Sequence, residues 1–511
     1  MRKFLRQLFT WKALVRLVFV VGLLATLLLI FITEENWRGR RAWAAYRSAA
    51  EARGEKLFLK DFIPPDVPDA ENYAAIPLIR GLFEKPPEGK KQPDPFVLPN
   101  GNMGRLANVS EQKTTNLETW QAYFVEKKLI PETSGNVGRD ILDGVKKYEP
   151  LLQELRDASA RPSSKFPPPR ENGIPDIRAH VALIRSGTLF GLRSEALLAL
   201  DDGPAAYREI SHMLRIHEAM VTEPTVIMAM LRNILLDQLG SVVRDGLAEG
   251  RWADAELRAM EKDLAGINLL DEFQSAISTD RGFCNQVLQQ IADSGARERG
   301  NTVVSLFELS LSKPSGAFEK FISRILWGLY PEGWVFQNMV KASEYCDQIS
   351  EPYRSGTKMN PVTFIPQRTL GQDWLKSIGA NSGPKQLYYS FLGSLLVSDI
   401  VEKGCLATHT MLQQARLACA MERFRQAKGA FPAELGALVP DYLPAMPVDV
   451  CDGNPLRYRR NGDGSYDLWS IGWDRKDDGG KPLEPDPHRG SGGFMFQPDW
   501  VWHMPKGKSP E

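Results

Sequence analysis

The chain has 511 residues, with 63 basic and 63 acidic side chains and a formal net charge of zero. Hydrophobic residues make up 43% of it and charged residues 25%, which are ordinary values for a globular protein. They exclude global disorder, a collagen-like repeat and a disulfide-dense miniprotein. At about 150 residues per domain, the length predicts about two to four units. A nucleic-acid-binding function is not expected, because it usually requires a surplus of basic residues.

The first predicted element is a membrane-spanning helix. Residues 17–32 read LVFVVGLLATLLLIFI without a charge, and residues 13–15 extend the apolar run beyond Arg16. A spanning helix needs about 20 apolar residues, and an arginine near its end can reach toward the lipid headgroups. We therefore expect a span at residues 13–33, after a basic stub at residues 1–12.

Charged residues on either side of this span predict its orientation. Basic side chains without any acid precede the apolar run, whereas Glu34 and Glu35 follow it. By the positive-inside rule, the N-terminus is cytoplasmic and the chain after about residue 33 is exported. This predicts a single-pass protein of the inner (cytoplasmic) membrane with its bulk in the periplasm or another extracytoplasmic compartment. A cleaved signal peptide is the alternative, although no small-x-small cleavage site directly follows the run.

The exported chain begins with a stalk and a proline-rich stretch, together residues 34–100. Helix-compatible spacing continues over residues 37–56, after which nine prolines between residues 64 and 99 favour extended backbone. Residues 101–391 form the predicted helical domain. Within it, residues 327–336 hold an aromatic cluster (Trp327, Tyr330, Trp334 and Phe336), interpreted as buried packing or, alternatively, as a groove for a ligand or partner.

The helical prediction is strongest from about residue 176 to residue 293. Apolar side chains recur there at intervals of three and four residues, as on one face of a helix. Pro224 is expected near the first turn of one helix and Asp254 as the N-cap of another. Short turns between such helices predict antiparallel hairpins, as in a helical bundle or a helical-repeat array. A regular 34-residue repeat is not evident.

Residues 392–511 combine a long helix with a small α+β module. The helix is expected over residues 392–428 and ends at Gly429. The module is predicted to contain a short helix at 433–439, strands at 456–460 and 466–471, and a closing strand within 494–502. The whole chain is thus predicted to be mainly α, with a single transmembrane helix, an exported helical bundle or repeat-like domain, and a C-terminal module with an antiparallel sheet.

Residues 420–480 resemble the C-terminal part of the major pseudopilins of type II secretion systems. The matching stretches are MERFRQAKGAFP, a short helix ending in Leu-Val-Pro, GNPLRYR and YDLWSIGWDRKDDGG. The resemblance implies a helix packed on a small antiparallel sheet, followed by a loop that binds calcium. Residues 1–24 lack the basic leader, glycine cleavage point and Phe-Thr-Leu-x-Glu-like start of that family. Assembly through prepilin processing is therefore not expected.

By this resemblance, the carbonyl of Ile471 and the carboxylate of Asp474 would bind Ca²⁺, with Asp477, Asp478 and Asp486 as further candidates. An Asp- and Gly-rich loop also suits this metal on chemical grounds, because Ca²⁺ takes about six to eight oxygen ligands. The alternative is a solvated turn without metal. The overall layout also resembles that of large uncharacterised membrane-anchored bacterial proteins, through PPDVPDAENYAAIPL, an EPTVI-like turn and PEGWVFQN; that family implies no activity.

No catalytic or cofactor-binding motif is evident. HExxH, GxSxG, Walker A and GxGxxG are lacking, and the S-x-x-K spacing of Ser310 and Lys313 is interpreted as chance because Pro314 follows it. The five cysteines are interpreted as small buried side chains with at most one disulfide. We expect a membrane-anchored scaffold or protein-interaction module whose protein partner is unknown. The alternatives are a component of a secretion or pilus-like system with a calcium-binding loop, and a hydrolase whose site is assembled from distant residues.

Overall fold

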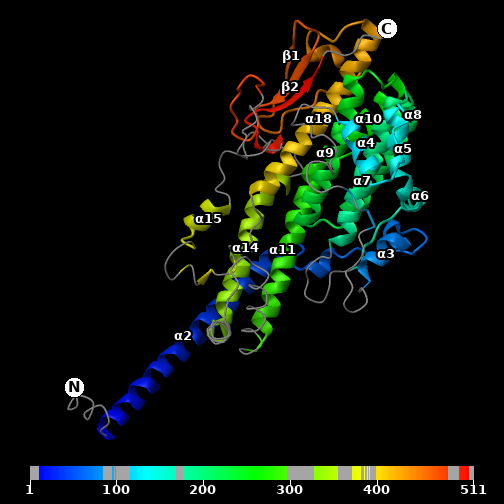
Figure 1. Ribbon diagram of the computed structural model, residues 1–511. Helices are drawn as coiled ribbons and strands as arrows, with labels where there is room; N and C mark the ends of the chain where they lie inside the picture. Colours follow the sequence, from blue (N-terminus) through cyan, green and yellow to red (C-terminus); the bar gives the residue numbers. More distant parts are fainter. Residues whose placement is uncertain are drawn as a thin grey trace, which may run out of the picture. The chain divides into compact units, whose positions relative to one another are not determined.

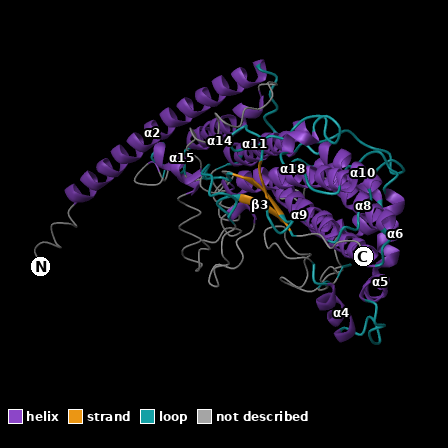
Figure 2. Cartoon of the chain, turned by 90° about the horizontal axis from the view of Figure 1, so that it is seen from above, coloured by secondary structure: helices purple, strands orange, loops and turns teal. Residues whose placement is uncertain are grey.

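The structure is a computed structural model that describes residues 11–84, 115–167, 177–295, 327–354, 371–380, 399–481 and 494–505, with single positions between these ranges. The chain divides into two compact units built from non-contiguous segments. Unit 1 contains residues 1–62, 278–349 and 369–396, and unit 2 contains residues 63–277, 350–368 and 397–511. The predicted mainly helical fold with a small antiparallel sheet is confirmed (Figures 1 and 2). The choice between a bundle and a repeat array stays open.

Unit 1 begins with α2, a single helix over Trp11–Ala52. Its N-terminal half is apolar, and its most apolar window is entirely exposed in the described structure. From Glu35 onward one face becomes buried, through Gly39, Trp43 and Ala50. These positions are four, four and seven residues apart, which is the spacing of one helix face. The apolar run and the stalk predicted from the sequence are therefore one continuous helix.

The stalk part of α2 is joined to α14 (Glu332–Arg354) and to the second half of α11 (Leu269–Asp293) by a buried ion-pair network. Arg281 is only 3% exposed, and its Nη1 donates at 2.6 Å to both Glu55 and Asp347. Tyr46 also donates to Asp347, at 2.6 Å. Because one guanidinium holds carboxylates that are far apart in sequence, Arg281 fixes these helices to one another. The short helix α15 (Gly371–Ser377) completes the described part of unit 1.

Unit 2 is built on packed helices. The ones that carry its core are α5 (Val137–Val145), α7 (Arg178–Ala199), α8 (Gly203–Val221), α9 (Val226–Ala248), α10 (Asp254–Ala265) and α18 (Asp399–Lys428). Three further helices are α3 (Pro77–Phe83), α4 (Leu117–Glu126) and α6 (Glu149–Ala158). Helix α7 packs against α5, α8 and α9, and α18 packs against α9 and α10. Although α9 is apolar enough to span a membrane, its most apolar window is mostly buried, as in the core helix of a globular unit.

The C-terminal sheet has three antiparallel strands in the order β1-β2-β3. They are β1 (Arg457–Arg460), β2 (Tyr466–Ser470) and β3 (Trp500–Met504). The central strand β2 is buried along its whole length, and α18 contacts β2 and β3. Gln414 of α18 donates to the carbonyls of Leu468 (3.3 Å) and Trp500 (2.7 Å). These two bonds place the sheet on the long helix, as the pseudopilin resemblance implies.

Several predicted boundaries differ from the structure. The closing strand begins at Trp500, and the predicted short helix is a 3-10 turn at Leu435–Leu438 (η8). Pro224, expected near the first turn of a helix, lies directly before Thr225, whose side chain caps α9 by accepting from the Met228 N–H. Asp254 is the first residue of α10 and no cap; its carboxylate instead accepts from Arg258 and Arg423. The predicted start of the long helix at residue 392 lies outside the described residues. The described part of this helix begins at residue 399.

Candidate functional site

The loop predicted to bind calcium follows β2 and is held close to the sheet by two glycines. Gly472 has a φ of +60°, and a Cβ added there would overlap the carbonyl oxygen of Pro498. Gly480 has a φ of +67° and lies against the ring of Trp469. Since both positions combine positive φ with a close contact, only glycine suits them without strain. The loop path is therefore fixed by local sterics.

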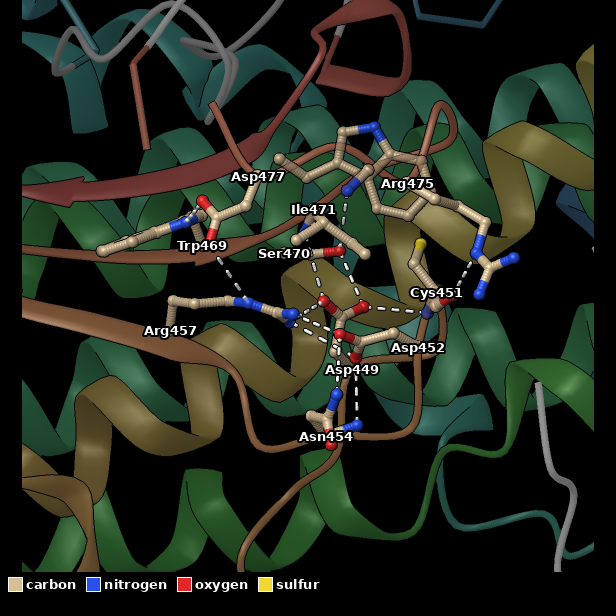
Figure 3. Close-up of polar contacts among 12 residues, drawn as sticks. Asp449, Cys451, Asp452, Asn454, Arg457, Trp469, Ser470, Ile471, Arg475 and Asp477 are labelled. Atoms are coloured by element: carbon tan, nitrogen blue, oxygen red, sulfur yellow. Dashed lines mark hydrogen bonds and ion pairs between the residues drawn. The ribbon is translucent and has the colours of Figure 1, made fainter. Parts of the chain in front are cut away.

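Asp449 is the centre of the polar cluster beneath this loop (Figure 3). Its Oδ1 accepts from the Cys451 N–H (2.8 Å) and the Ser470 hydroxyl (2.7 Å). Its Oδ2 accepts from the Ile471 N–H (3.1 Å) and from Arg457 Nη1 (2.6 Å). Burial raises the pKa of Asp449, and these hydrogen bonds and the arginine only partly offset that rise. With four donors in place, both oxygens of this carboxylate are occupied.

Arg457 lies among three carboxylates of the same cluster. It pairs with Asp449 and Asp452, and its Nε is 3.8 Å from Asp477 Oδ2. Burial acts to raise the pKa of Asp452, but the hydrogen bonds from Arg457 and Asn454 outweigh it and lower that pKa. The guanidinium thus supplies within the chain the positive charge that a bound cation would bring to this cluster.

The side chains of the predicted calcium ligands have different surroundings. Asp477 Oδ1 accepts from Trp469 Nε1 and from the Gly479 N–H, each at 2.9 Å, and the first of these bonds is the main cause of its lowered pKa. Asp474 and Asp478 are exposed, and the Asp474 carboxylate accepts from the Lys476 N–H at 3.0 Å. Ile471 uses its N–H to bind Asp449. Among the described residues, which exclude Asp486, no three such side chains gather around one point where a metal could bind.

Asp499 was not anticipated from the sequence. It lies at the start of β3 with 0% exposure, and its Oδ2 accepts from the Gly480 N–H at 2.8 Å. Its Oδ1 has no hydrogen-bond partner in the described part of the chain. Burial is the main cause of its raised pKa; the backbone N–H groups of Gly480 and Asp478 partly offset the rise, and the charges of Asp477 and Asp478 add to it. A buried carboxylate oxygen without a donor is the one feature here that fits an additional cation.

A second buried acidic group lies between α7 and α9. Glu195 and Asp245 are hydrogen-bonded side chains, and burial, followed by the charge of Asp245, raises the pKa of Glu195 well above its usual range. Asp245 keeps its charge balanced by Arg244 Nη2 (3.1 Å) and by the Thr115 N–H (2.8 Å). A proton held on Glu195 accounts for the hydrogen bond between the two carboxyl groups. Both residues are buried, so that a solvent-borne substrate has no direct access to them.

The hydrolase alternative depends on an activated nucleophile, and one serine in the described structure contacts a histidine. The Ser159 hydroxyl is 3.3 Å from Nδ1 of His212. It also donates to the Leu155 carbonyl at 3.0 Å, a bond back along its own helix. A hydroxyl has one proton, so the bond to the Leu155 carbonyl competes with donation to His212. Activation of a serine by a histidine requires that donation. The Ser310–Lys313 pair lies outside the described residues.

Comparison with known proteins gives no relative: no family model, no curated protein and no solved structure matches this chain. The resemblance of residues 420–480 to the pseudopilins therefore stays a prediction based on the matching stretches and on their order along the chain.

Proposed function

We propose that this chain is a single-pass membrane protein whose exported part acts as a scaffold or protein-interaction module. The observation that carries the proposal is α2. Its apolar half is exposed on all sides, and the same helix continues without a break into the packed stalk of unit 1. Exposed leucines, valines and phenylalanines along several helical turns are costly in water and stable in lipid. The described polar clusters support a structural role, because their charges are paired within the chain.

Membrane insertion is tested by alkaline extraction of membranes that contain the full-length protein. We expect the wild type to remain with the lipid, and a Leu24→Asp, Leu28→Asp variant to be extracted, because two carboxylates interrupt the apolar run. The matched control is Ile227→Asp, which places a carboxylate on an exposed apolar position of α9 and should stay in the membrane. Extraction of the wild type would contradict the anchor.

Orientation and partner are tested on the same membranes. A C-terminal reporter enzyme that is active only outside the cytoplasm should be active if the bulk of the chain is exported. Chemical crosslinking followed by purification should return the same protein partner in repeated experiments. An inactive reporter would contradict the predicted orientation. Crosslinking without any reproducible partner would contradict the scaffold proposal.

A second candidate is a component of a secretion or pilus-like system whose C-terminal loop binds calcium. Two observations favour it: the helix-on-sheet arrangement of α18 with β2 and β3, and the unpartnered Oδ1 of Asp499 beside the acidic loop. If Ca²⁺ binds there, its addition should raise the melting temperature and a chelator should lower it again. An Asp499→Asn variant should lose this response, whereas Asp463→Asn, in the β1–β2 turn, should keep it. A melting temperature that does not change with Ca²⁺ would contradict calcium binding by this loop.

A further inference from the structure

Helix α14 meets α2 directly after the predicted membrane span, at a place that we call the junction (residues 31–41 of α2 with residues 327–334). A Cβ added to Gly39 would overlap the backbone of Gly333, and one added to Gly333 would overlap the backbone of Glu35. The Gly333 N–H donates to the Asn36 side chain at 3.0 Å. Two glycines thus allow the helix backbones to touch, which fixes the position of α14 along α2.

The position of the junction relative to the lipid follows from the geometry of α2. Phe31 belongs to the apolar run, and its ring makes an edge-on contact with Trp334 at 6.0 Å between centroids. Trp334 Nε1 donates at 2.8 Å to Glu35, the first buried acidic residue after the run. From Phe31 to Gly39 the helix rises by about 12 Å. The headgroup region on each side of the hydrocarbon core is about 5–8 Å thick. The junction therefore begins at the hydrocarbon edge and crosses the headgroup layer.

The exposed side chains of the junction have the chemistry of a membrane interface. Trp37 is 55% exposed and Leu329 is 54% exposed, which is unfavourable for both in water. Arg41 lies over the Trp37 ring at 5.3 Å. Arg38 and Arg40, exposed on the same turn of α2, pair with Glu35 and Glu332, and each guanidinium has further N–H donors beyond its ion pair. Tryptophan rings are enriched where an apolar and a wet environment meet, and guanidinium groups bind phosphate through several hydrogen bonds.

We infer that the junction is a lipid-binding surface, at which Trp37 and Leu329 insert between phospholipid headgroups and the neighbouring arginines bind their phosphates. This inference rests on the proposed membrane anchor. It adds that unit 1 is held against the bilayer and does not rotate freely on a flexible stalk. The occupant is lipid because the exposed tryptophan and leucine adjoin the helix end that leaves the hydrocarbon. A second copy of the chain would be another occupant and is an outcome of the experiment below.

The inference is tested with nitroxide labels on the full-length protein in nanodiscs of phosphatidylcholine and phosphatidylglycerol. Single cysteines replace Leu24, Leu329 or Ser48, all exposed positions. The five native cysteines are buried, which keeps background labelling low. Collisions with oxygen report lipid contact, and collisions with a water-soluble nickel chelate report water contact. Ser48 is the matched control, because it lies about 26 Å beyond Phe31 along α2.

We expect the Leu24 label to contact oxygen and not nickel, the Ser48 label to contact nickel, and the Leu329 label to contact both, with nickel access several-fold below that of Ser48. Nickel access at Leu329 equal to that at Ser48, with Leu24 in lipid, would overturn the inference and leave the anchor intact. A Leu329 label shielded from both reagents would mean that protein covers the junction, which also overturns it. A Leu24 label in water would instead refute the anchor itself.

A second measurement does not depend on labels. Lipids brominated near the headgroup end of the acyl chain quench tryptophans that lie at that depth. Wild-type protein should lose more fluorescence in these lipids than a Trp37→Phe variant does, because Trp37 is the exposed tryptophan of the junction. Equal quenching in the two proteins would overturn the insertion of Trp37.

Discussion

Replacing Asp449 by alanine should unfold the C-terminal module more readily than any change in its exposed loop. The substitution removes an acceptor from the buried N–H groups of Cys451 and Ile471, and it removes one of the two carboxylates that pair with Arg457. A buried donor left without an acceptor costs about 1–3 kcal/mol, and two such donors give a destabilisation of about 4 kcal/mol. The raised pKa of Asp449 indicates that burial already disfavours its ionised form. This limits the destabilisation expected for the Asp449→Ala variant.

The matched control is Asp477→Ala in the same cluster. Asp477 is half-exposed, and its loss frees only the Trp469 Nε1 and Gly479 N–H groups, which water can reach in part. The cost should be about 1 kcal/mol. Urea unfolding of the full-length protein in detergent, followed by tryptophan fluorescence, measures both values, since Trp469, Trp500 and Trp502 lie in the sheet. Equal losses below about 1 kcal/mol in the two variants would refute the structural role of Asp449.

Three further predictions concern other parts of the chain. Arg281→Met should destabilise unit 1 by about 3 kcal/mol in the same urea assay, because it removes the buried cation of Glu55 and Asp347 and leaves them only the half-exposed Arg53. Arg47→Ala, at a side chain that is 51% exposed, should cost less than about 0.5 kcal/mol, and equal effects would contradict the network. Glu195 holds a proton in the folded state, and the unfolded chain releases this proton above about pH 4.3. The free energy of unfolding should therefore fall as the pH rises from there toward the raised pKa of the folded state. The expected slope is up to about 1.4 kcal/mol per pH unit. Glu195→Gln should remove this slope between about pH 5 and pH 8, and an unchanged slope would assign the proton to another group. Gly39→Leu should separate α2 from α14 and increase hydrogen exchange at that contact. Gly22→Ala is the control and should leave exchange unchanged, because nothing lies within 4 Å of a Cβ added there. Protection that survives in the Gly39→Leu variant would show that the glycine contact is dispensable.

Local sequence patterns were sufficient for the elements with strong periodicity or strong turn signals. The apolar run of α2, the helices between residues 178 and 293 and the β1–β2 hairpin were all predicted, with small errors at the ends. The errors arose at a helix start, as at Asp254, which is the first residue of α10 and not its cap. They also arose where pairing with a neighbouring strand decides the boundary, as at Trp500.

The polar site was predictable only in part. Asp474 and Asp477 are visible as an acidic loop, but nothing near them in sequence indicates Arg457 as the cation of the cluster or Asp499 as the oxygen without a donor. Asp449 is more than 20 residues from its partner Ile471 along the chain, and the two meet only because β2 ends beside the turn at residue 449. Contacts of this kind depend on strand register, which no local pattern encodes.

The sequence by itself determined that the chain carries a helix suited to lipid, a helical middle and a hairpin-containing end, because each is set by neighbours within a few residues. The tertiary structure decided which charges are paired and where the span ends against protein. Arg281 joins α2, α11 and α14, and Gly39 lets α14 touch α2 next to the apolar run. The buried charges of the described clusters are therefore held in specific pairs, some of them between distant segments, because a buried charge is tolerated only beside its partner.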